Sequence, residues 1–354
     1  MQYTDHTPGR TVRTGDKECL FFSGFSYLGL HQHTGFQTLI REGIEKYGLI
    51  FPSSRVANLR LNIYEELETA IAALLQQESA AVFSSGYLSS QAAAQFAAQT
   101  RQVIYAPDTH PSLWVNNPVL PQTSRDEWVA ATIKLINSQP HDTFAIITDT
   151  VHPIQGVIHS FKWLQELERR VLVVADDSHG IGVLGPLGQG GIHFLPRSPF
   201  LTYLLTASLA KAFSTEGGVV SGPASIIEAL KKSPVFSAST SLPPANAHAW
   251  LNAKDLFAAQ RMQLQQNIAF LIHLLSDCGI HNPFALPIFV LPPINDLAAS
   301  LLEKNIVISS FPYPLPSSQP VNRAVVSALH SQEDISVLAG SLARVSREVS
   351  RKGA

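Results

Sequence analysis

Two short apolar runs, each followed at once by polar residues, constrain the fold of this chain most. Residues 171–174 (VLVV) lead into 175–182 (ADDSHGIG), and residues 203–206 (YLLT) lead into 207–211 (ASLAK). A short continuous apolar run bounded in this way is typical of a buried strand in a parallel sheet. In open α/β sheets, functional groups gather at the carboxyl ends of such strands. The pattern therefore predicts an α/β fold with a site at this sheet edge.

An acid, an imidazole and an amine follow these two strands. They are Asp176, His179 and Lys211, and the strands that present them lie roughly thirty residues apart, as in a βαβ unit. Pyridoxal 5'-phosphate needs an amine for its Schiff base and a carboxylate on its pyridine nitrogen, so the trio suits this cofactor. From spacing alone, a helix-capping Asp, a loop His and a surface Lys remain equally open.

The residues around the trio carry a resemblance to a known family. Residues 176–185 (DDSHGIGVLG) closely resemble the signature of the α-oxoamine synthases, and residues 208–212 (SLAKA) with the following Gly217 and Gly218 are similar to the family's lysine segment. Further matches run in order from residues 27–30 (YLGL) to the C-terminus. The resemblance implies the fold type I of pyridoxal-phosphate enzymes, also called the class II aminotransferase fold. That fold has a large α/β domain with a mainly parallel seven-stranded sheet and a small α+β C-terminal domain.

The resemblance also implies a reaction. The family's enzymes are acyltransferases that condense an amino acid with an acyl-CoA and release carbon dioxide. Examples are 8-amino-7-oxononanoate synthase and 2-amino-3-ketobutyrate CoA ligase. The family further implies a homodimer with shared active sites. Which amino acid and acyl donor this chain would use stays open.

By the same resemblance, each site residue has an expected role. Lys211 forms the Schiff base and acts as a base, Asp176 holds the pyridine nitrogen, His179 contacts the phenolic oxygen, and His110 stacks on the ring. The cofactor-binding set is Ser85, Gly86, Tyr87, His110, Asp149, Asp176, His179, Ser208, Lys211, Ser239 and Thr240, of which Ser239 and Thr240 serve the partner's cofactor. We expect no metal ligands. Asp177 is expected to be a helix-capping or solvated carboxylate.

Three positions depart from the family's pattern. Phe25 stands where the family has an Asn that helps to hold a carboxylate, and Pro153 replaces a Ser near the cofactor. Pro153 has neither a hydroxyl nor an N–H group to offer. Near the C-terminus, Val321 replaces the first Arg of an Arg-x-Arg strand, which leaves Arg323. We therefore name Phe25 and Arg323 as candidate substrate residues.

Sequence periodicity also predicts the domain boundaries. Residues 1–20 show no periodicity, so we expect an N-terminal arm of residues 1–45, a large cofactor-binding domain of 46–245 and a small domain of 246–354. The expected strands are 80–83, 103–105, 144–149, 288–291, 306–308 and 324–326, and the expected helices are 64–77, 164–170 and one long helix from about 245 towards Gly279.

Composition excludes some classes of function. The formal net charge is −2, which gives no electrostatic case for nucleic acid or an anionic membrane surface. No apolar run approaches the length of a membrane span, and residues 1–20 lack the apolar core of a signal peptide. Two cysteines, Cys19 and Cys278, do not make a disulfide framework, so we expect a cytoplasmic protein.

Two alternatives stay open at this level. The departures at Phe25, Pro153 and Val321 would also suit another pyridoxal-phosphate reaction on the same scaffold, such as an aminotransferase or a decarboxylase. A cofactor-binding protein with weak or no catalysis is the third possibility. The retained Asp176, which makes the ring an electron sink, argues against it.

Overall fold

The computed structural model describes residues 3–141, 143–313 and 318–352, with side chains to residue 344. It divides into two compact units. Unit 1 combines residues 1–33, 153–157 and 255–354, and unit 2 combines residues 34–152 and 158–254. The first residues thus belong with the C-terminal part of the chain rather than to a separate arm, and the boundaries fall after His33 and Lys254 rather than at the expected 45 and 245.

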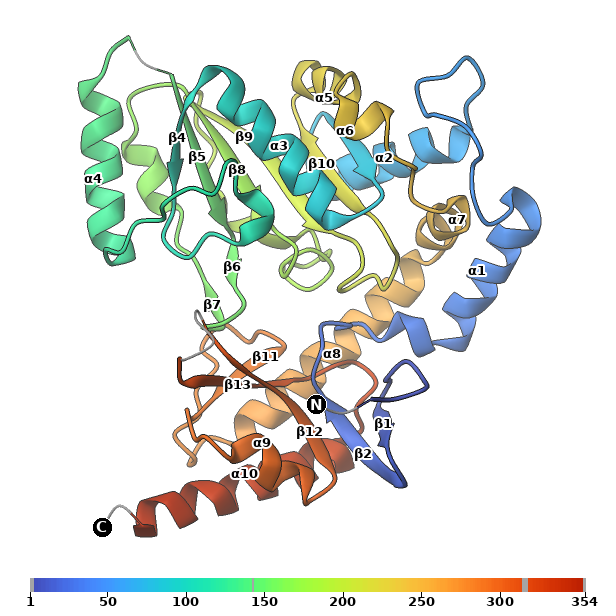
Figure 1. Cartoon of the computed structure of the whole chain (residues 1–354), viewed down its shortest axis with the longest axis vertical. Helices are drawn as coiled ribbons and strands as arrows, with labels where there is room; N and C mark the ends of the chain where they lie inside the picture. The colour runs from blue at the N-terminus through green and yellow to red at the C-terminus, as the bar shows by residue number, and fades with distance from the viewer. Residues whose placement is uncertain (1–2, 142, 314–317, 353–354) are drawn as a thin grey trace. The chain divides into compact units, whose positions relative to one another are not determined.

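Unit 2 is built on one mixed sheet (Figure 1). Its strand order is β3-β10-β9-β8-β5-β4. The strands are β3 (Ser79–Phe83), β4 (Gln102–Tyr105), β5 (Phe144–Asp149), β8 (Val171–Asp176), β9 (Leu201–Ser208) and β10 (Gly218–Gly222). β4, β5, β8 and β9 pair in parallel, whereas β10 runs antiparallel to both of its neighbours. The predicted buried parallel strands are confirmed.

The sheet has six strands among the described residues, so the expectation of seven is wrong. β4 lies at one edge of the sheet, and the chain that follows it is poorly suited to form a further strand. Asn116 and Asn117 have left-handed φ values of 54° and 48°. Pro118 and Pro121 have no N–H group for a ladder hydrogen bond.

Unit 2 also contains several helices. They are α1 (Thr34–Tyr47), α2 (Asn62–Leu74), α3 (Gly86–Thr100), α4 (Arg125–Ser138), α5 (Ala224–Lys231), α6 (Pro234–Ser237) and α7 (Pro244–Asn252), with short 3-10 turns η2 (Pro111–Leu113), η3 (Lys162–Glu166) and η4 (Gly190–Phe194). α2 confirms the helix predicted over 64–77, within a few residues at each end. The predicted helix over 164–170 is instead the short turn η3.

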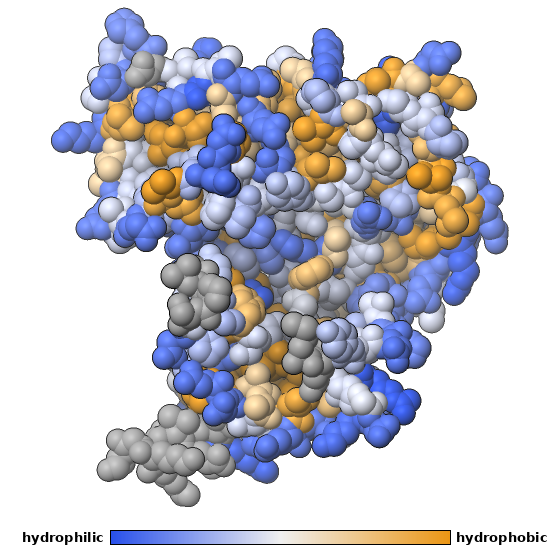
Figure 2. Space-filling model, viewed as in Figure 1, coloured by the Kyte–Doolittle hydropathy of each residue, from blue (hydrophilic) through white to orange (hydrophobic). Residues whose placement is uncertain are grey.

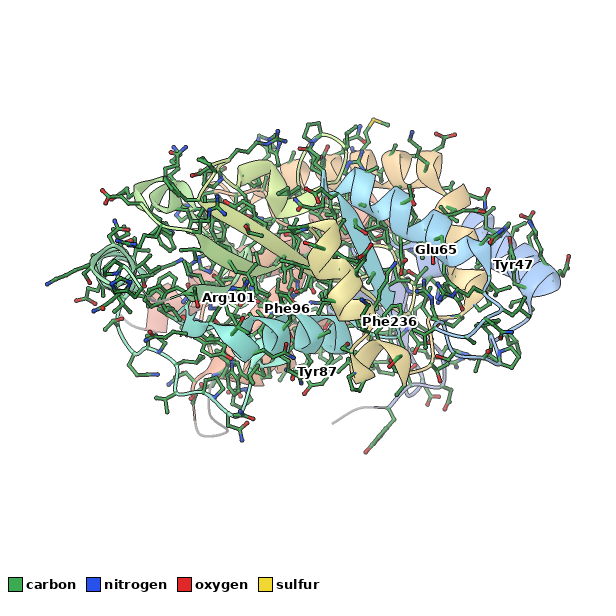
Figure 3. The ribbon with its side chains drawn as sticks, turned by 90° about the horizontal axis from the view of Figure 1, so that it is seen from above. Tyr47, Glu65, Tyr87, Phe96, Arg101 and Phe236 are labelled. Atoms are coloured by element: carbon green, nitrogen blue, oxygen red, sulfur yellow. The ribbon has the colours of Figure 1, made fainter. Side chains whose placement is uncertain are left out.

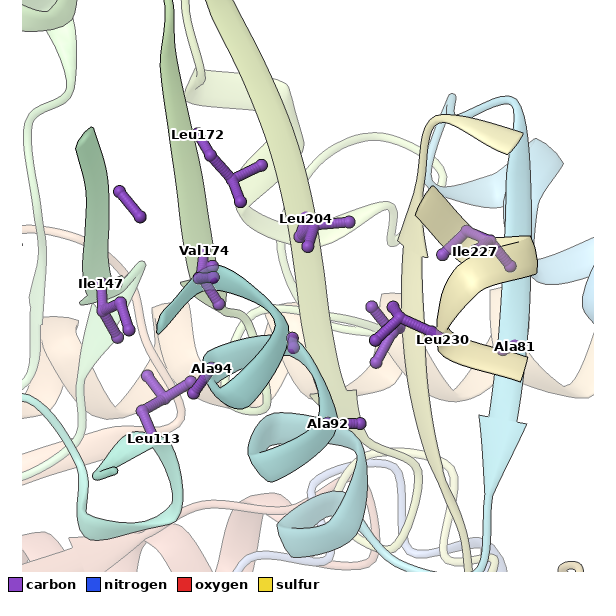
Figure 4. Packing of buried hydrophobic residues seen from close by; sticks show 14 of the residues in the cluster. Ala81, Ala92, Ala94, Leu113, Ile147, Leu172, Val174, Leu204, Ile227 and Leu230 are labelled. Atoms are coloured by element: carbon purple, nitrogen blue, oxygen red, sulfur yellow. The ribbon is translucent and has the colours of Figure 1, made fainter. Parts of the chain in front are cut away.

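The core of unit 2 lies between α3 and the sheet. Small side chains of α3, among them Ala92 and Ala94, belong to the same buried cluster as the strand residues Val174 and Leu204 (Figure 4). Alanine at these positions lets the helix axis approach the sheet closely, and the apolar faces of both elements leave water together. α3 is therefore held firmly against the strands that end in the polar residues of the site.

Unit 1 contains a five-stranded sheet of order β1-β2-β12-β13-β11. Its strands are β1 (Thr11–Thr14), β2 (Lys17–Phe22), β11 (Ile288–Leu291), β12 (Ile306–Pro312) and β13 (Pro320–Val325). Its helical elements are η1 (Leu30–Gln32), α8 (Lys254–Leu274), α9 (Leu297–Leu302) and α10 (Gln332–Lys352). The three predicted C-terminal strands are confirmed as β11, β12 and β13.

Two expectations for these regions are wrong. Residues 1–20 do not form an unstructured arm, because β1 and β2 form a hairpin and β2 pairs in parallel with β12. The single long helix from residue 245 is two helices, since Ala253 adopts φ −101° and ψ 16° between α7 and α8. β6 (Val151–His152) and β7 (Val157–Ile158) form a separate two-stranded sheet.

Candidate active site

Asp176 is the centre of the site in unit 2. It is the last residue of β8, and its side chain is buried between the neighbouring strand ends. Its Oδ1 atom accepts a hydrogen bond from the Ser178 backbone N–H at 2.8 Å. Its Oδ2 atom accepts one from the Ser90 hydroxyl at 2.9 Å and one from the Thr206 hydroxyl at 3.3 Å. These donors stabilise the ionised carboxylate.

Lys211 and His179 contact each other. The Lys211 Nζ atom lies 2.9 Å from the His179 Nε2 atom, which is a hydrogen-bond distance. Lys211 follows β9 and His179 follows β8, two strands that pair in parallel. The structure therefore brings together the amine and the imidazole that the sequence predicted at neighbouring strand ends.

His110 lies at the start of η2, after β4. Its ring Nδ1 accepts the Ser112 backbone N–H at 3.2 Å and lies 2.8 Å from the Ser112 hydroxyl, which fixes the ring orientation. Burial lowers the pKa of His110, and the Asp176 carboxylate opposes this shift. A neutral, oriented imidazole is the form expected of a ring that stacks on a flat cofactor.

Asp149 ends β5 and is paired in register with Asp176. Its carboxylate accepts the backbone N–H of His110 at 2.9 Å. Burial, reinforced by the negative charge of Asp176, raises the pKa of Asp149 to about 8. A carboxyl group with a pKa raised in this way, next to a second carboxylate, is an arrangement common in active sites.

Asp177 is buried, so the expectation of a capping or solvated carboxylate is wrong. Its side chain accepts hydrogen bonds from the Thr150 hydroxyl and from the Gly191 backbone N–H at 2.9 Å. Burial raises its pKa to about 7. A Cβ atom on Gly190 would lie 1.8 Å from the Asp177 Oδ2 atom, so only glycine fits there. Asp177 therefore fixes the glycine-rich loop that follows His179.

The turn between β3 and α3 has the form of an anion site. Ser85 is the N-cap of the 15-residue helix α3, and its hydroxyl accepts the Leu88 N–H at 3.3 Å. A Cβ atom on Gly86 would lie 2.5 Å from the Ser208 Cβ atom, so this glycine allows a close approach of the two segments. Tyr87 lies at this end of α3 and is exposed (Figure 3). Free backbone N–H groups at a helix N-terminus favour a phosphate.

Ser239 and Thr240 lie apart from these residues. Within the chain they line a small cleft with Arg55 and Phe236, and the Ser239 hydroxyl donates to the Val235 carbonyl. Arg55 is held in place by a 2.9 Å ion pair with Glu68. Their expected contact with the cofactor phosphate of a second subunit stays a prediction.

The two candidate substrate residues belong to unit 1. Arg323 lies on β13, where its Nη1 atom donates to the Pro153 carbonyl at 2.9 Å and its guanidinium stacks 5.1 Å from the Phe311 ring centroid. Burial lowers the pKa of Arg323. Phe25 is half exposed, at 50%. Arg323 is therefore engaged inside unit 1, with its Nε atom buried and without a partner among the described residues.

Sequence reasoning missed several residues of the site. Ser90, Thr206 and Ser178 bind Asp176, and Thr150 binds Asp177. Only Ser90 carried a usable signal. It lies one helical turn beyond the Ser85–Gly86 turn, and a polar residue facing a sheet at that spacing needs a partner.

Together these features define the class of pyridoxal-phosphate-binding proteins. An α/β unit presents a buried carboxylate, a hydrogen-bonded amine and imidazole, and a helix N-terminus from one sheet edge. These are the groups that pyridoxal 5'-phosphate requires for its pyridine nitrogen, its aldehyde and its phosphate. The donors around Asp176 fit that role because they favour a carboxylate charge opposite a pyridinium.

Comparison with known proteins identifies the family. The family model for aminotransferase class I and II matches residues 26–342, so the chain belongs to that family. It is 26% identical to an 8-amino-7-oxononanoate synthase of Citrifermentans bemidjiense, with 99% of this chain and 94% of that protein covered. It is 25% identical to a serine palmitoyltransferase of Bacteriovorax stolpii, with 94% of this chain and 84% of that protein covered.

A solved structure shows the same fold. The serine palmitoyltransferase structure described as SPT with PLP superposes with a TM-score of 0.83 at 20% identity, covering 99% of this chain and 93% of that one. The predicted fold type I and the resemblance to the α-oxoamine synthases are confirmed, and the cofactor is pyridoxal 5'-phosphate. Within the described residues, no helix is both long and apolar enough to cross a membrane.

Proposed function

We propose that this chain is an α-oxoamine synthase, a pyridoxal-phosphate-dependent acyltransferase that condenses an amino acid with an acyl thioester and releases carbon dioxide. The observation that carries the proposal is the 2.9 Å contact between Lys211 and His179 beside the buried Asp176. Its relatives along nearly the whole chain are acyltransferases of this kind.

Lys211 is the residue that holds the cofactor and moves the substrate proton. The Lys211 amine, hydrogen-bonded to the His179 imidazole, is placed to accept the proton on the α-carbon of an amino acid once it is released from the cofactor. Bound at this site, pyridoxal phosphate supplies an electron sink for the charge that develops at that carbon.

His179 orients Lys211, because its Nε2 atom lies 2.9 Å from the Lys211 Nζ atom. Its position follows from the loop that Asp177 fixes through Thr150 and Gly191. Because that loop is held by a buried carboxyl group, the imidazole loses little conformational freedom when substrate binds. Such preorganisation lowers the cost of aligning the reacting groups.

His110 and Asp149 complete the site on the side of β4 and β5. His110 provides a flat, neutral face, and Asp149 fixes the backbone of His110 through the 2.9 Å hydrogen bond. The raised pKa of Asp149 means that it gives little negative charge to the site at neutral pH. Asp176 is then the carboxylate that faces the cofactor.

The proposal includes a homodimer with shared active sites. Apolar side chains in and beyond the end of α1 are exposed in the single chain, at 70% for Leu49, 57% for Ile50 and 72% for Leu59. Hydrophobic surface gathers on this part of unit 2 (Figure 2). An exposed apolar patch of this kind favours a protein partner, and a second copy would bring Ser239 and Thr240 to the other site.

The departures in unit 1 bear on the substrate. With Phe25 and Val321 in place of polar and cationic residues, Arg323 is the candidate for holding the amino acid's carboxylate. The acyl donor in this proposal is an acyl-CoA. A cytoplasmic location is also part of the proposal, favoured by two cysteines that are both free thiols.

The test is product formation with purified holoenzyme and paired substrates. Each amino acid is incubated with and without acyl-CoAs of several chain lengths, while released carbon dioxide and free CoA thiol are measured. The proposal expects both products in equal amounts and only when both substrates are present. Formation of an oxo acid from the amino acid alone would instead indicate an aminotransferase, and carbon dioxide without thiol would indicate a decarboxylase.

A further inference from the structure

Two adjacent serines on α3 differ in what they bind. Ser89 and Ser90 are both buried. The Ser89 hydroxyl donates at 2.8 Å to the Gly86 carbonyl of its own helix, as serines within helices commonly do. The Ser90 hydroxyl instead leaves the helix and donates at 2.9 Å to Oδ2 of Asp176.

The hydrogen bonds at Asp176 can be counted. An ionised carboxylate has about four acceptor positions, two on each oxygen. On Oδ2, Ser90 and Thr206 fill both. On Oδ1, the Ser178 N–H fills one, which leaves a single open position on that oxygen.

We infer that Ser90 is a positioning residue for the cofactor, which directs Oδ1 of Asp176 to the pyridine nitrogen by occupying Oδ2. This inference rests on the proposed cofactor chemistry. It also assigns α3 two tasks. Its N-terminus, at Ser85 and Gly86, faces the phosphate, and Ser90 lies one turn further, about 6 Å along the axis.

The Ser90 hydroxyl also affects the basicity of Asp176. A donor on Oδ2 stabilises the negative charge of Asp176 and makes the carboxylate less basic. The proton between Asp176 and the pyridine nitrogen then stays on the nitrogen. Without the donor, the proton moves towards Asp176 and the ring becomes a weaker electron sink.

The experiment uses holoenzyme reconstituted with pyridoxal phosphate labelled with ¹⁵N in the ring. The ¹⁵N chemical shift reports whether the nitrogen is protonated, a quantity that a merely structural role would not move. We expect Ser90→Ala to shift the resonance towards the value of a neutral pyridine and to lower kcat about 10- to 100-fold, as for a lost hydrogen bond to a charged group. Ser90→Thr, which keeps the hydroxyl, should restore both.

Ser89→Ala is the matched control, since it removes a neighbouring buried hydroxyl that does not contact Asp176. If Ser90→Ala does not fold, Ser90→Cys keeps the volume with a much weaker donor and should show the same direction of shift. A resonance in Ser90→Ala or Ser90→Cys equal to that of wild type would overturn the inference. Failure of the wild type to bind the labelled cofactor would instead overturn the proposed function.

Discussion

The strand ends of unit 2 and the β13 region of unit 1 differ in how closely they keep the family's pattern. In unit 2, the carboxylate, the imidazole and the amine are all retained and hydrogen-bonded, from Asp176 to the pair of His179 and Lys211. In unit 1, Phe25 and Val321 stand at two positions that we expect to bind a carboxylate in the family, and Arg323 donates a hydrogen bond to the Pro153 carbonyl.

The difference has a physical reason. The cofactor end depends on groups that sheet register and buried hydrogen bonds place together, so one substitution there disturbs several others. The β13 region presents separate side chains, each of which can be replaced with less effect on its neighbours. We therefore infer that this chain keeps the family's cofactor chemistry and has changed what it accepts as substrate.

The largest effect expected is that of Lys211→Ala. No other amine among the described residues lies beside His179 and Asp176 in the structure, so the variant should lose all detectable turnover. Borohydride reduction of wild type should fix the cofactor covalently to the chain, and mass spectrometry of the variant should show no such adduct. A retained adduct on another lysine would remove Lys211 from its role.

Asp176→Asn should come next, with a loss in kcat on the order of 10²–10³-fold, because a neutral amide cannot stabilise a pyridinium charge. The variant should still bind the cofactor, since the phosphate turn at Gly86 is unchanged. Equilibrium dialysis and steady-state rates measure the two properties separately. Near-normal turnover would contradict the electron-sink role.

A gain of function would sharpen the comparison further. Val321→Arg restores the family's first Arg on β13, and a charge-assisted pair with a carboxylate is worth about 1.5–3 kcal/mol. We expect amino acids to bind roughly 10- to 100-fold more tightly, measured by titration of the cofactor absorbance. Unchanged binding would show that this position does not limit substrate recognition.

Arg323→Ala is the matching loss. If Arg323 holds the substrate carboxylate, amino-acid binding should weaken roughly 10- to 100-fold while the affinity for cofactor stays the same. The variant also loses the hydrogen bond to Pro153, so its thermal unfolding is measured in parallel. A lower melting temperature with unchanged amino-acid binding would give Arg323 a structural role only.

The smallest effect expected concerns Asp177 and pH. Its folded-state pKa is raised to about 7, well above the unfolded value near 3.9, so the folded state binds the extra proton between these values. The stability that Asp177 contributes is therefore full below about pH 4 and is lost as pH rises through about 7. Asp177→Asn, which mimics the neutral form, should gain stability relative to wild type apoprotein as pH rises from 5 to 8. A difference in melting temperature that is constant with pH would contradict this assignment.

The sequence predicted those parts of the fold that local patterns control. β8, β9 and the turn before α3 carry apolar runs followed by small or polar residues, and all three were predicted in place. The N-terminal hairpin was missed although its two-residue turn, Gly15–Asp16, is a local signal. The pairing of β2 with β12, almost three hundred residues away, is different. No local periodicity can show such a pairing.

The candidate site divides in the same way. Lys211, His179 and Asp176 could be predicted because each lies at or just after the end of a strand that a short apolar run marks in the sequence. Asp177 could not, because its role depends on the partners that folding brings to it. Ser90 offered only the signal of a polar residue one turn into α3, which does not name Asp176 as its partner. From the sequence, we expected an aspartate next to another aspartate to be solvated. In the structure, the backbone of Gly190 and Gly191 lies against the Asp177 carboxylate.

The most direct test of the account is a titration of the wild-type holoenzyme with glycine, alanine and serine, followed by the cofactor absorbance. A retained cofactor site with altered carboxylate recognition predicts tight cofactor binding, together with amino-acid dissociation constants in the millimolar range or weaker. The loss of a charge-assisted pair, worth about 1.5–3 kcal/mol, weakens binding roughly 10- to 100-fold. Micromolar binding of any of the three amino acids, unaffected by Arg323→Ala, would contradict the claim that the substrate end has changed.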